Sequence, residues 1–198
     1  MAGGPSGEMT LSRYTRSLDQ FVRILDQMPT GAWDAWSPCS EWTAREIVGH
    51  IMWSQQLVHA WVAGTEPPSY RYCPGGDRPG PLVGTDPVAA GKTVQGACAA
   101  VLDRHALARD VETRAGATTV GAFLANLTVD NTAHVWDLGT TAGLDVRLDA
   151  DLVDNALRWA KQNEMLVRES GMFADVLTPP EPADAQTRLL AALGRRAW

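Results

Sequence analysis

Cysteine and lysine are scarce in this sequence of 198 residues, and each shortage excludes a class of protein. The cysteines, Cys39, Cys73 and Cys98, are widely spaced and form no Cys-x-x-Cys pair, which argues against a disulfide framework or a zinc site built from thiolates. A reducing cytoplasm is the expected location. The lysines are Lys92 and Lys161 alone, no basic cluster occurs, and the net charge is −6, so we expect no nucleic-acid partner.

Long apolar runs are also missing. No stretch approaches the roughly 18 apolar residues that a membrane span needs, and the first residues have neither the basic start nor the apolar run of a secretion signal. We therefore expect a soluble protein in which residues 1–9 form a flexible leader and residues 10–198 form a single domain. A domain of this length buries roughly 70% of its unfolded surface, so a metal ion would serve function rather than folding.

Helical periodicity dominates what is present, and no segment shows the two-residue alternation of a half-buried strand. Apolar spacing, capping residues and stop signals predict helices over about 11–28, 43–63, 86–105, 119–142, 149–170 and 183–193. The segment 65–85, rich in glycine and proline, is expected to be an irregular loop that could roof a pocket. The sequence therefore predicts an all-α fold, a four-helix bundle with a short C-terminal helix.

Two residues of the kind that bind metals lie one helical turn apart in the segment Asp-Asn-Thr-Ala-His. In a helix, Asp130 and His134 project from one face, and both fall on the apolar stripe that should be buried. His50 has a comparable inward position in an earlier helix, whereas His59 points about 180° away from it. Two histidines and one carboxylate can form a three-ligand site for a divalent metal, with room for water or substrate.

Other polar residues near these positions leave alternatives open. One turn beyond the ligand pair, Asp137 either orients the imidazole of a ligand or forms a salt bridge to an arginine. Glu46 could be a fourth ligand, but its place in a capping box already explains it. Cys39 is better explained as a small buried residue than as a reactive thiol. His105 ends the third helix, where a protonated ring would interact favourably with the helix dipole.

The segments that carry these features resemble a known family. They are residues 36–50, 130–148, 171–176 and 188–195. Together they resemble the DinB-like metal-binding superfamily, and within it the actinobacterial group related to the metal-binding domain of mycothiol-dependent maleylpyruvate isomerase. The resemblance implies a four-helix bundle that holds one divalent ion through His50, Asp130 and His134. Zinc is the default ion because it accepts histidine and carboxylate ligands in an open site, with nickel, iron and manganese as alternatives.

The resemblance also implies a class of chemistry. Relatives include thiol-dependent S-transferases and isomerases, so we expect an enzyme that uses mycothiol on a small electrophilic metabolite, with a metal-bound thiolate or hydroxide as nucleophile. The alternatives are a thiol-independent lyase, cyclase or hydrolase, and a non-catalytic metal-binding module. One departure counts against the isomerisation itself: the isomerase adds a carboxy-terminal domain that supplies an arginine to its active site, and this chain ends at Trp198. A homodimer is a further possibility.

Overall fold

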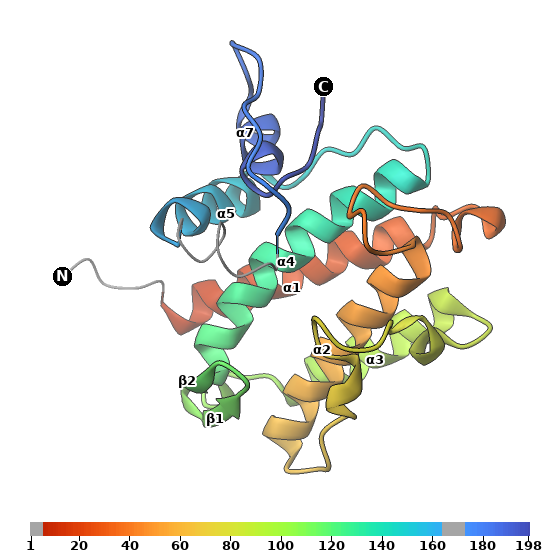
Figure 1. Cartoon of the computed structure of the whole chain (residues 1–198). Helices are drawn as coiled ribbons and strands as arrows, with labels where there is room; N and C mark the ends of the chain where they lie inside the picture. The colour runs from red at the N-terminus through yellow and green to blue at the C-terminus, as the bar shows by residue number, and fades with distance from the viewer. Residues whose placement is uncertain (1–5, 164–172) are drawn as a thin grey trace.

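The computed structural model of the chain describes residues 6–163 and 173–198, and most of these residues are helical (Figure 1). The helices are α1 (Gly7–Leu25), α2 (Ala44–Ala63), α3 (Pro87–Val101), α4 (Val120–Thr141), α5 (Ala150–Gln162) and α7 (Ala185–Ala192). Short 3₁₀ helices are η1 (Thr30–Ala32), η2 (Tyr70–Tyr72), η3 (Gly80–Val83) and η4 (Ala106–Ala108). Within the described ranges, no helix is both long and apolar enough to cross a membrane.

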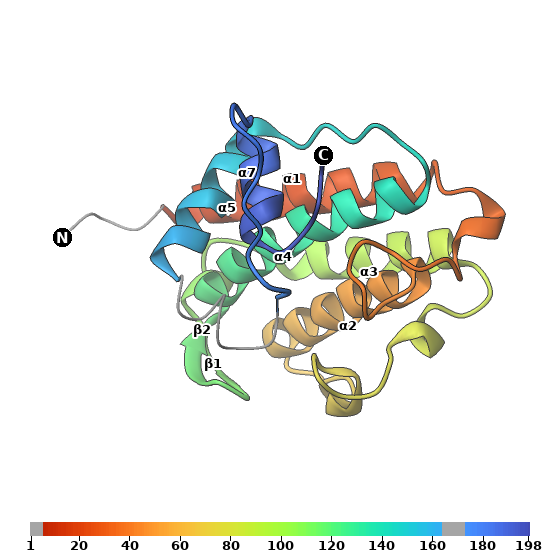
Figure 2. The ribbon, with the colours of Figure 1, turned by 45° about the horizontal axis from the view of Figure 1, so that its top comes forward.

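The helices α1 to α4 contact one another in a closed ring. α1 packs against α4, α4 against α2, α2 against α3, and α3 against α1, while α5 lies on α4 and α7 lies on α5 (Figure 2). The space between them is filled by fully buried side chains that include Tyr14, Phe21, Ile47, Ile51, Leu124 and Leu138. This arrangement brings α2 and α4, which carry the predicted ligands, into direct contact.

A two-stranded hairpin departs from the all-α expectation. β1 (Asp110–Thr113) pairs antiparallel with β2 (Gly116–Thr119) immediately before α4. In these two strands only Val111 is buried. A strand without a buried face does not alternate apolar and polar residues. The two-residue alternation that predicts a strand is therefore absent from this part of the sequence.

The first helix begins earlier than expected. α1 starts at Gly7 because the side chain of Ser6 accepts a hydrogen bond from the Met9 backbone N–H. Residues 7–9, which the sequence assigned to the leader, are therefore helical. Residues 1–5 of that leader lie outside the described residues.

The third helix ends earlier than expected, at Val101. Beyond it, the side chain of Asp103 accepts hydrogen bonds from the backbone N–H groups of His105 and Ala106, and this local turn competes with continued helix. The helix-dipole role predicted for His105 is therefore wrong. α5 is described as far as Gln162, and the rest of that predicted helix, residues 164–170, lies outside the described residues.

The segment between α2 and α3 lies along α2. It contains η2 and η3, so the expectation of a wholly irregular loop is wrong, and η3 packs directly against α2. Gly49 permits this close approach, since a Cβ atom there would come within 2.2 Å of the Pro79 backbone oxygen. The segment therefore covers the face of α2 that carries Gly49 and Trp53.

Candidate metal centre

The three predicted ligands converge where α2 meets α4. His50 Nε2 lies 2.8 Å from Asp130 Oδ2, and His134 Nε2 lies 3.4 Å from Asp130 Oδ1. One ligand atom from each residue lies within 4.8 Å of the other two. Two atoms that each bind zinc at about 2.0–2.1 Å with a tetrahedral angle lie roughly 3.3 Å apart. The spacing of these side chains therefore suits a single metal ion.

The local sequence explains the inward position of each ligand. A capping box of Thr43 and Glu46 starts α2 and sets the position of His50 one turn further on. The Glu46 carboxylate accepts the Thr43 N–H at 2.8 Å and pairs with Arg78 at 3.0 Å. It is therefore committed to the cap and to this ion pair. α4 begins after Thr119, whose side chain accepts a backbone N–H of the first turn.

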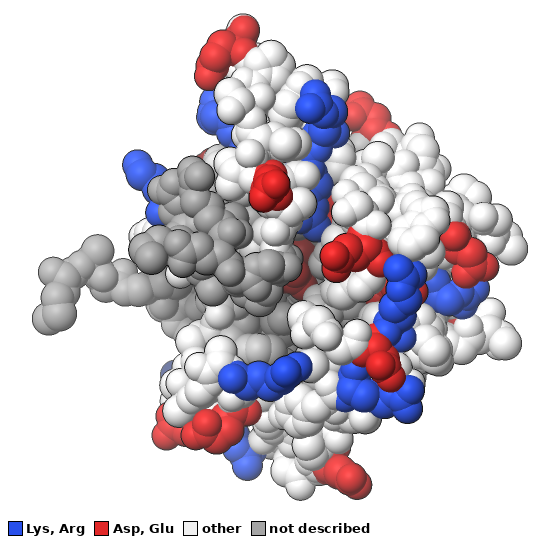
Figure 3. Space-filling view, in the orientation of Figure 1, with Lys and Arg blue, Asp and Glu red and all other residues white. Residues whose placement is uncertain are grey.

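The site is closed on its histidine side and open on its carboxylate side. The side chains of His50 and His134 are 6% and 4% exposed, whereas that of Asp130 is 28% exposed. Trp42 covers the two imidazoles, with its ring centre 4.7 Å from that of His50 and 5.6 Å from that of His134. Figure 3 shows a recess on the side of the molecule where α2 and α4 lie next to one another. Among the three candidate ligands, Asp130 is the one most exposed to solvent.

The charges at the site stabilise one another. Burial alone would raise the pKa of Asp130, but His134 and His50 outweigh it and hold that pKa well below its usual range. Burial alone would lower the pKa of His134, but Asp130 and Asp137 outweigh it and raise the pKa to about 10. Without a metal ion, His134 therefore carries a proton that binding of a metal must displace.

A second carboxylate supports His134 from its other ring nitrogen. Asp137, whose side chain is fully buried, has Oδ2 3.0 Å from His134 Nδ1. A ring that donates from Nδ1 presents its Nε2 to a metal. The same carboxylate accepts hydrogen bonds from Arg195, at 3.0 Å from Nη2 and 3.3 Å from Nε. The two alternatives for Asp137, orienting a histidine and pairing with an arginine, are therefore present together.

Cys39 lies beside this site. Its thiol, the His134 ring and the Asp137 carboxylate form a second group whose atoms lie within 4.8 Å of one another. Within the described ranges, Cys39 does not join the complete set of His50, Asp130 and His134. Burial raises the pKa of its thiol. The half-buried Cys39 thus lies beside the candidate ligand His134 but is not part of the group formed by His50, Asp130 and His134.

Two side chains at the site were missed by the sequence reasoning. Trp42 precedes α2 in an irregular segment, and Arg195 follows α7, so neither belongs to a periodic pattern. The available signals were indirect. Both residues fall in segments that resemble the family, and Asp137 had an arginine partner as one of its two alternatives.

Comparison with known proteins identifies the family. Residues 14–139, a span that includes all three candidate ligands, match the family described as mycothiol maleylpyruvate isomerase N-terminal domain. Two uncharacterized proteins of Mycobacterium tuberculosis, MT0763 of strain CDC 1551 / Oshkosh and Rv0738 of strain H37Rv, are each 26% identical over 188 residues, which cover 93% of this chain and 97% of the relative. No solved structure gives a significant match. The chain thus belongs to the mycothiol maleylpyruvate isomerase N-terminal domain family, a DinB-like family of metal-binding proteins.

Proposed function

We propose that this protein is a metal-dependent enzyme, a mycothiol-dependent S-transferase or isomerase of a small electrophilic metabolite, on a four-helix framework of DinB type. The observation that carries the proposal is the convergence of His50, Asp130 and His134 at a point that solvent reaches. The family supports the thiol, because it takes its name from a mycothiol maleylpyruvate isomerase.

The donor set suits zinc first. Two imidazole nitrogens and one carboxylate oxygen are typical ligands of an open zinc site, and the same set accepts nickel, iron or manganese. The contact between Asp137 and Nδ1 of His134 leaves Nε2 as the ligand atom. Nε2 of His50 is the ring nitrogen that faces Asp130, at 2.8 Å from Oδ2, so Nε2 is again the atom that points to the proposed metal position. A divalent ion held there would lower the pKa of a thiol or of water and polarise a carbonyl group.

The guanidinium of Arg195 is occupied by acceptors within the protein. Its Nε and Nη2 are occupied by Asp137, and its Nη1 donates to the Leu193 carbonyl oxygen at 2.7 Å. With these nitrogens engaged, Arg195 has little left to offer a carboxylate on a substrate. We therefore propose that Arg195 does not itself bind the electrophile.

The remaining parts of the proposal concern partners and location. We propose a cytoplasmic protein with a small-molecule substrate and no nucleic-acid partner, in keeping with a net charge of −6. Trp42 covers the histidine rings, so the thiol and the electrophile would both approach on the Asp130 side. We also propose that the protein can form a homodimer that leaves the Asp130 side of the site accessible.

Metal analysis tests the centre itself. Purified protein should carry about one equivalent of a divalent ion, and His50→Ala or His134→Ala should lose most of it because each removes one of three ligands. His59→Ala is the matched control, since His59 lies on α2 outside both candidate ligand groups and should be dispensable. Full occupancy in both ligand variants would refute the site.

An activity screen separates the kinds of function. Zinc-loaded protein supplied with mycothiol and a panel of small electrophiles should consume thiol or isomerise the electrophile, and omission of mycothiol should abolish the reaction. Turnover that continues without any thiol would replace the proposal with a lyase, cyclase or hydrolase. Stable metal binding without turnover of any electrophile would favour a non-catalytic metal-binding module.

A further inference from the structure

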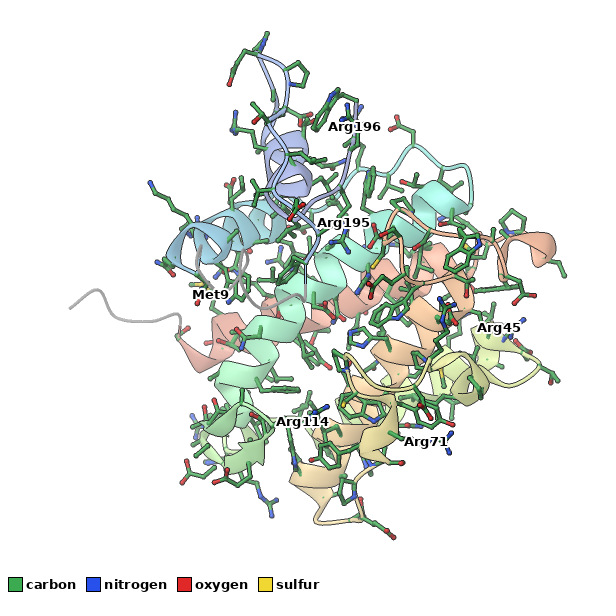
Figure 4. All side chains as sticks on the ribbon, in the orientation of Figure 1. Met9, Arg45, Arg71, Arg114, Arg195 and Arg196 are labelled. Atoms are coloured by element: carbon green, nitrogen blue, oxygen red, sulfur yellow. The ribbon has the colours of Figure 1, made fainter. Side chains whose placement is uncertain are left out.

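A buried arginine near the carboxy terminus reaches the metal centre through a second residue. Arg195 is only 5% exposed, although it follows the short helix α7. Its Nε and Nη2 meet the two oxygens of Asp137 at 3.3 and 3.0 Å, and its Nη1 donates to Leu193. Figure 4 shows Arg195 directed from the carboxy-terminal segment toward α4. Each nitrogen of the guanidinium therefore has an acceptor.

The backbone around Arg195 is arranged to hold it in this place. Leu189, Leu190 and Leu193 are fully buried and anchor α7 and its end in the core. Gly194 then turns the chain at a φ of +78°, and a Cβ atom there would come within 2.6 Å of Ala174. Arg195 is thus positioned by the fold itself, unlike an exposed arginine whose ion pair must first order a flexible side chain.

Arg195, Asp137 and His134 form a continuous line of contacts. Asp137 Oδ2 lies 3.0 Å from both Arg195 Nη2 and His134 Nδ1. A fully buried carboxylate is costly unless charged and hydrogen-bonded partners surround it, and a two-pronged contact with arginine also fixes its plane. A carboxylate fixed in this way keeps the Nδ1–H of His134 as a donor, and Nε2 then faces Asp130.

We infer that Arg195 is a positioning residue of the metal centre, which acts through Asp137 to fix the orientation of His134 and so makes metal affinity depend on the docked carboxy-terminal segment. The inference rests on the proposed metal centre. Arg195 itself contacts neither His134 nor the other two candidate ligands in the hydrogen bonds and ion pairs of the described residues.

Zinc affinity, measured by competition with a chelator, is the first test. Arg195→Gln should weaken zinc binding by roughly 10- to 100-fold, the range observed when an outer partner of a ligand is removed. Arg195→Lys retains the charge but not the two-pronged geometry. The zinc affinity of this variant should therefore lie between that of the wild type and that of Arg195→Gln. Arg188→Gln is the matched control, because Arg188 is an exposed arginine of α7 whose Nη1 donates to the Ala183 carbonyl oxygen. It should bind zinc like the wild type.

A double-mutant cycle tests the route of the effect. If Arg195 acts through Asp137, then Arg195→Gln should add little to the loss already caused by Asp137→Asn, because the two residues belong to one chain of contacts. Losses that multiply in the double variant would overturn the route, even if each single variant binds zinc weakly. Circular dichroism of each variant separates a loss of affinity from a loss of fold.

Proton NMR of the metal-free protein gives a readout that needs no metal. The Nδ1–H of His134 should appear as a downfield, slowly exchanging signal that is absent in His134→Gln. Arg195→Gln or Arg195→Lys should broaden or shift this signal, while Arg188→Gln should leave it unchanged. If wild-type protein binds no divalent ion, the proposed function fails together with the effect on metal affinity, and the NMR signal still decides whether Arg195 orients His134 through Asp137. If wild-type protein binds zinc and Arg195→Gln retains both its affinity and the signal, the inference alone fails.

Discussion

Raising the pH should destabilise the metal-free protein, because His134 holds a proton that the unfolded chain releases more easily. Burial alone would lower its pKa, but Asp130 and Asp137 raise it from 6.5 to about 10. A pKa that is higher in the folded state stabilises the fold fully below the unfolded value, and this contribution is lost as the pH rises toward 10. With about 1.4 kcal/mol per pKa unit, the whole shift corresponds to about 5 kcal/mol, of which about 2 kcal/mol should disappear between about pH 6.5 and 8.5.

Urea unfolding in the presence of a chelator measures this loss across that pH range. His134→Gln removes the titrating ring, so its free energy of unfolding should change much less over the same range, while His59→Gln should lose stability like the wild type. The range stops near pH 8.5 because burial raises the pKa of Cys98 from 9.0 to about 11, and ionisation of thiols in the unfolded chain would add a loss of the same sign. Equal slopes for wild type and His134→Gln would refute the reasoning.

Three further predictions concern proton release on zinc binding, the ligand Asp130 and the turn at Gly194. Zinc binding near neutral pH should release protons, because His134 must lose the one on Nε2, and calorimetry in two buffers of different ionisation enthalpy should detect them; no release would show that the ring is already neutral. Asp130→Ala should abolish metal binding and turnover yet retain helical circular dichroism, whereas unfolding of the wild type on chelation would show that the metal holds the fold together. Gly194→Ala should lower the free energy of unfolding by at least about 1 kcal/mol in urea, because of its positive φ and the contact with Ala174, while Gly31→Ala, with open space around it, should change little.

The helices and the convergence of three side chains could be predicted because both depend on local periodicity. A polar residue on an apolar stripe is conspicuous, and His50, Asp130 and His134 each occupy such a position in the sequence; the two histidines are buried and Asp130 is partly buried. Their meeting also requires α2 to contact α4, and helices with apolar stripes have few other ways to bury them. Local pattern and global packing therefore led to the same three residues.

The elements that were missed lack a periodic signal for identifiable reasons. The hairpin formed by β1 and β2 has one buried side chain, so its sequence shows no alternation of apolar and polar residues. The end of α3 depends on the side chain of Asp103, which captures two backbone N–H groups just beyond it. In both places the local structure depends on hydrogen bonds made by backbone groups. The pattern of apolar residues in the sequence does not predict these hydrogen bonds.

The support of the candidate ligands depends on contacts that are remote in sequence. Arg195 and Asp137 are 58 residues apart, far beyond the reach of any helical pattern. Energetics nevertheless constrain the answer, because a fully buried carboxylate one turn from His134 requires a cationic partner. That requirement predicts that an arginine or histidine must reach Asp137, but several arginines in the chain could satisfy it. The choice of Arg195 is made by the fold, where buried leucines fix α7 and the left-handed turn at Gly194 directs the next side chain toward α4.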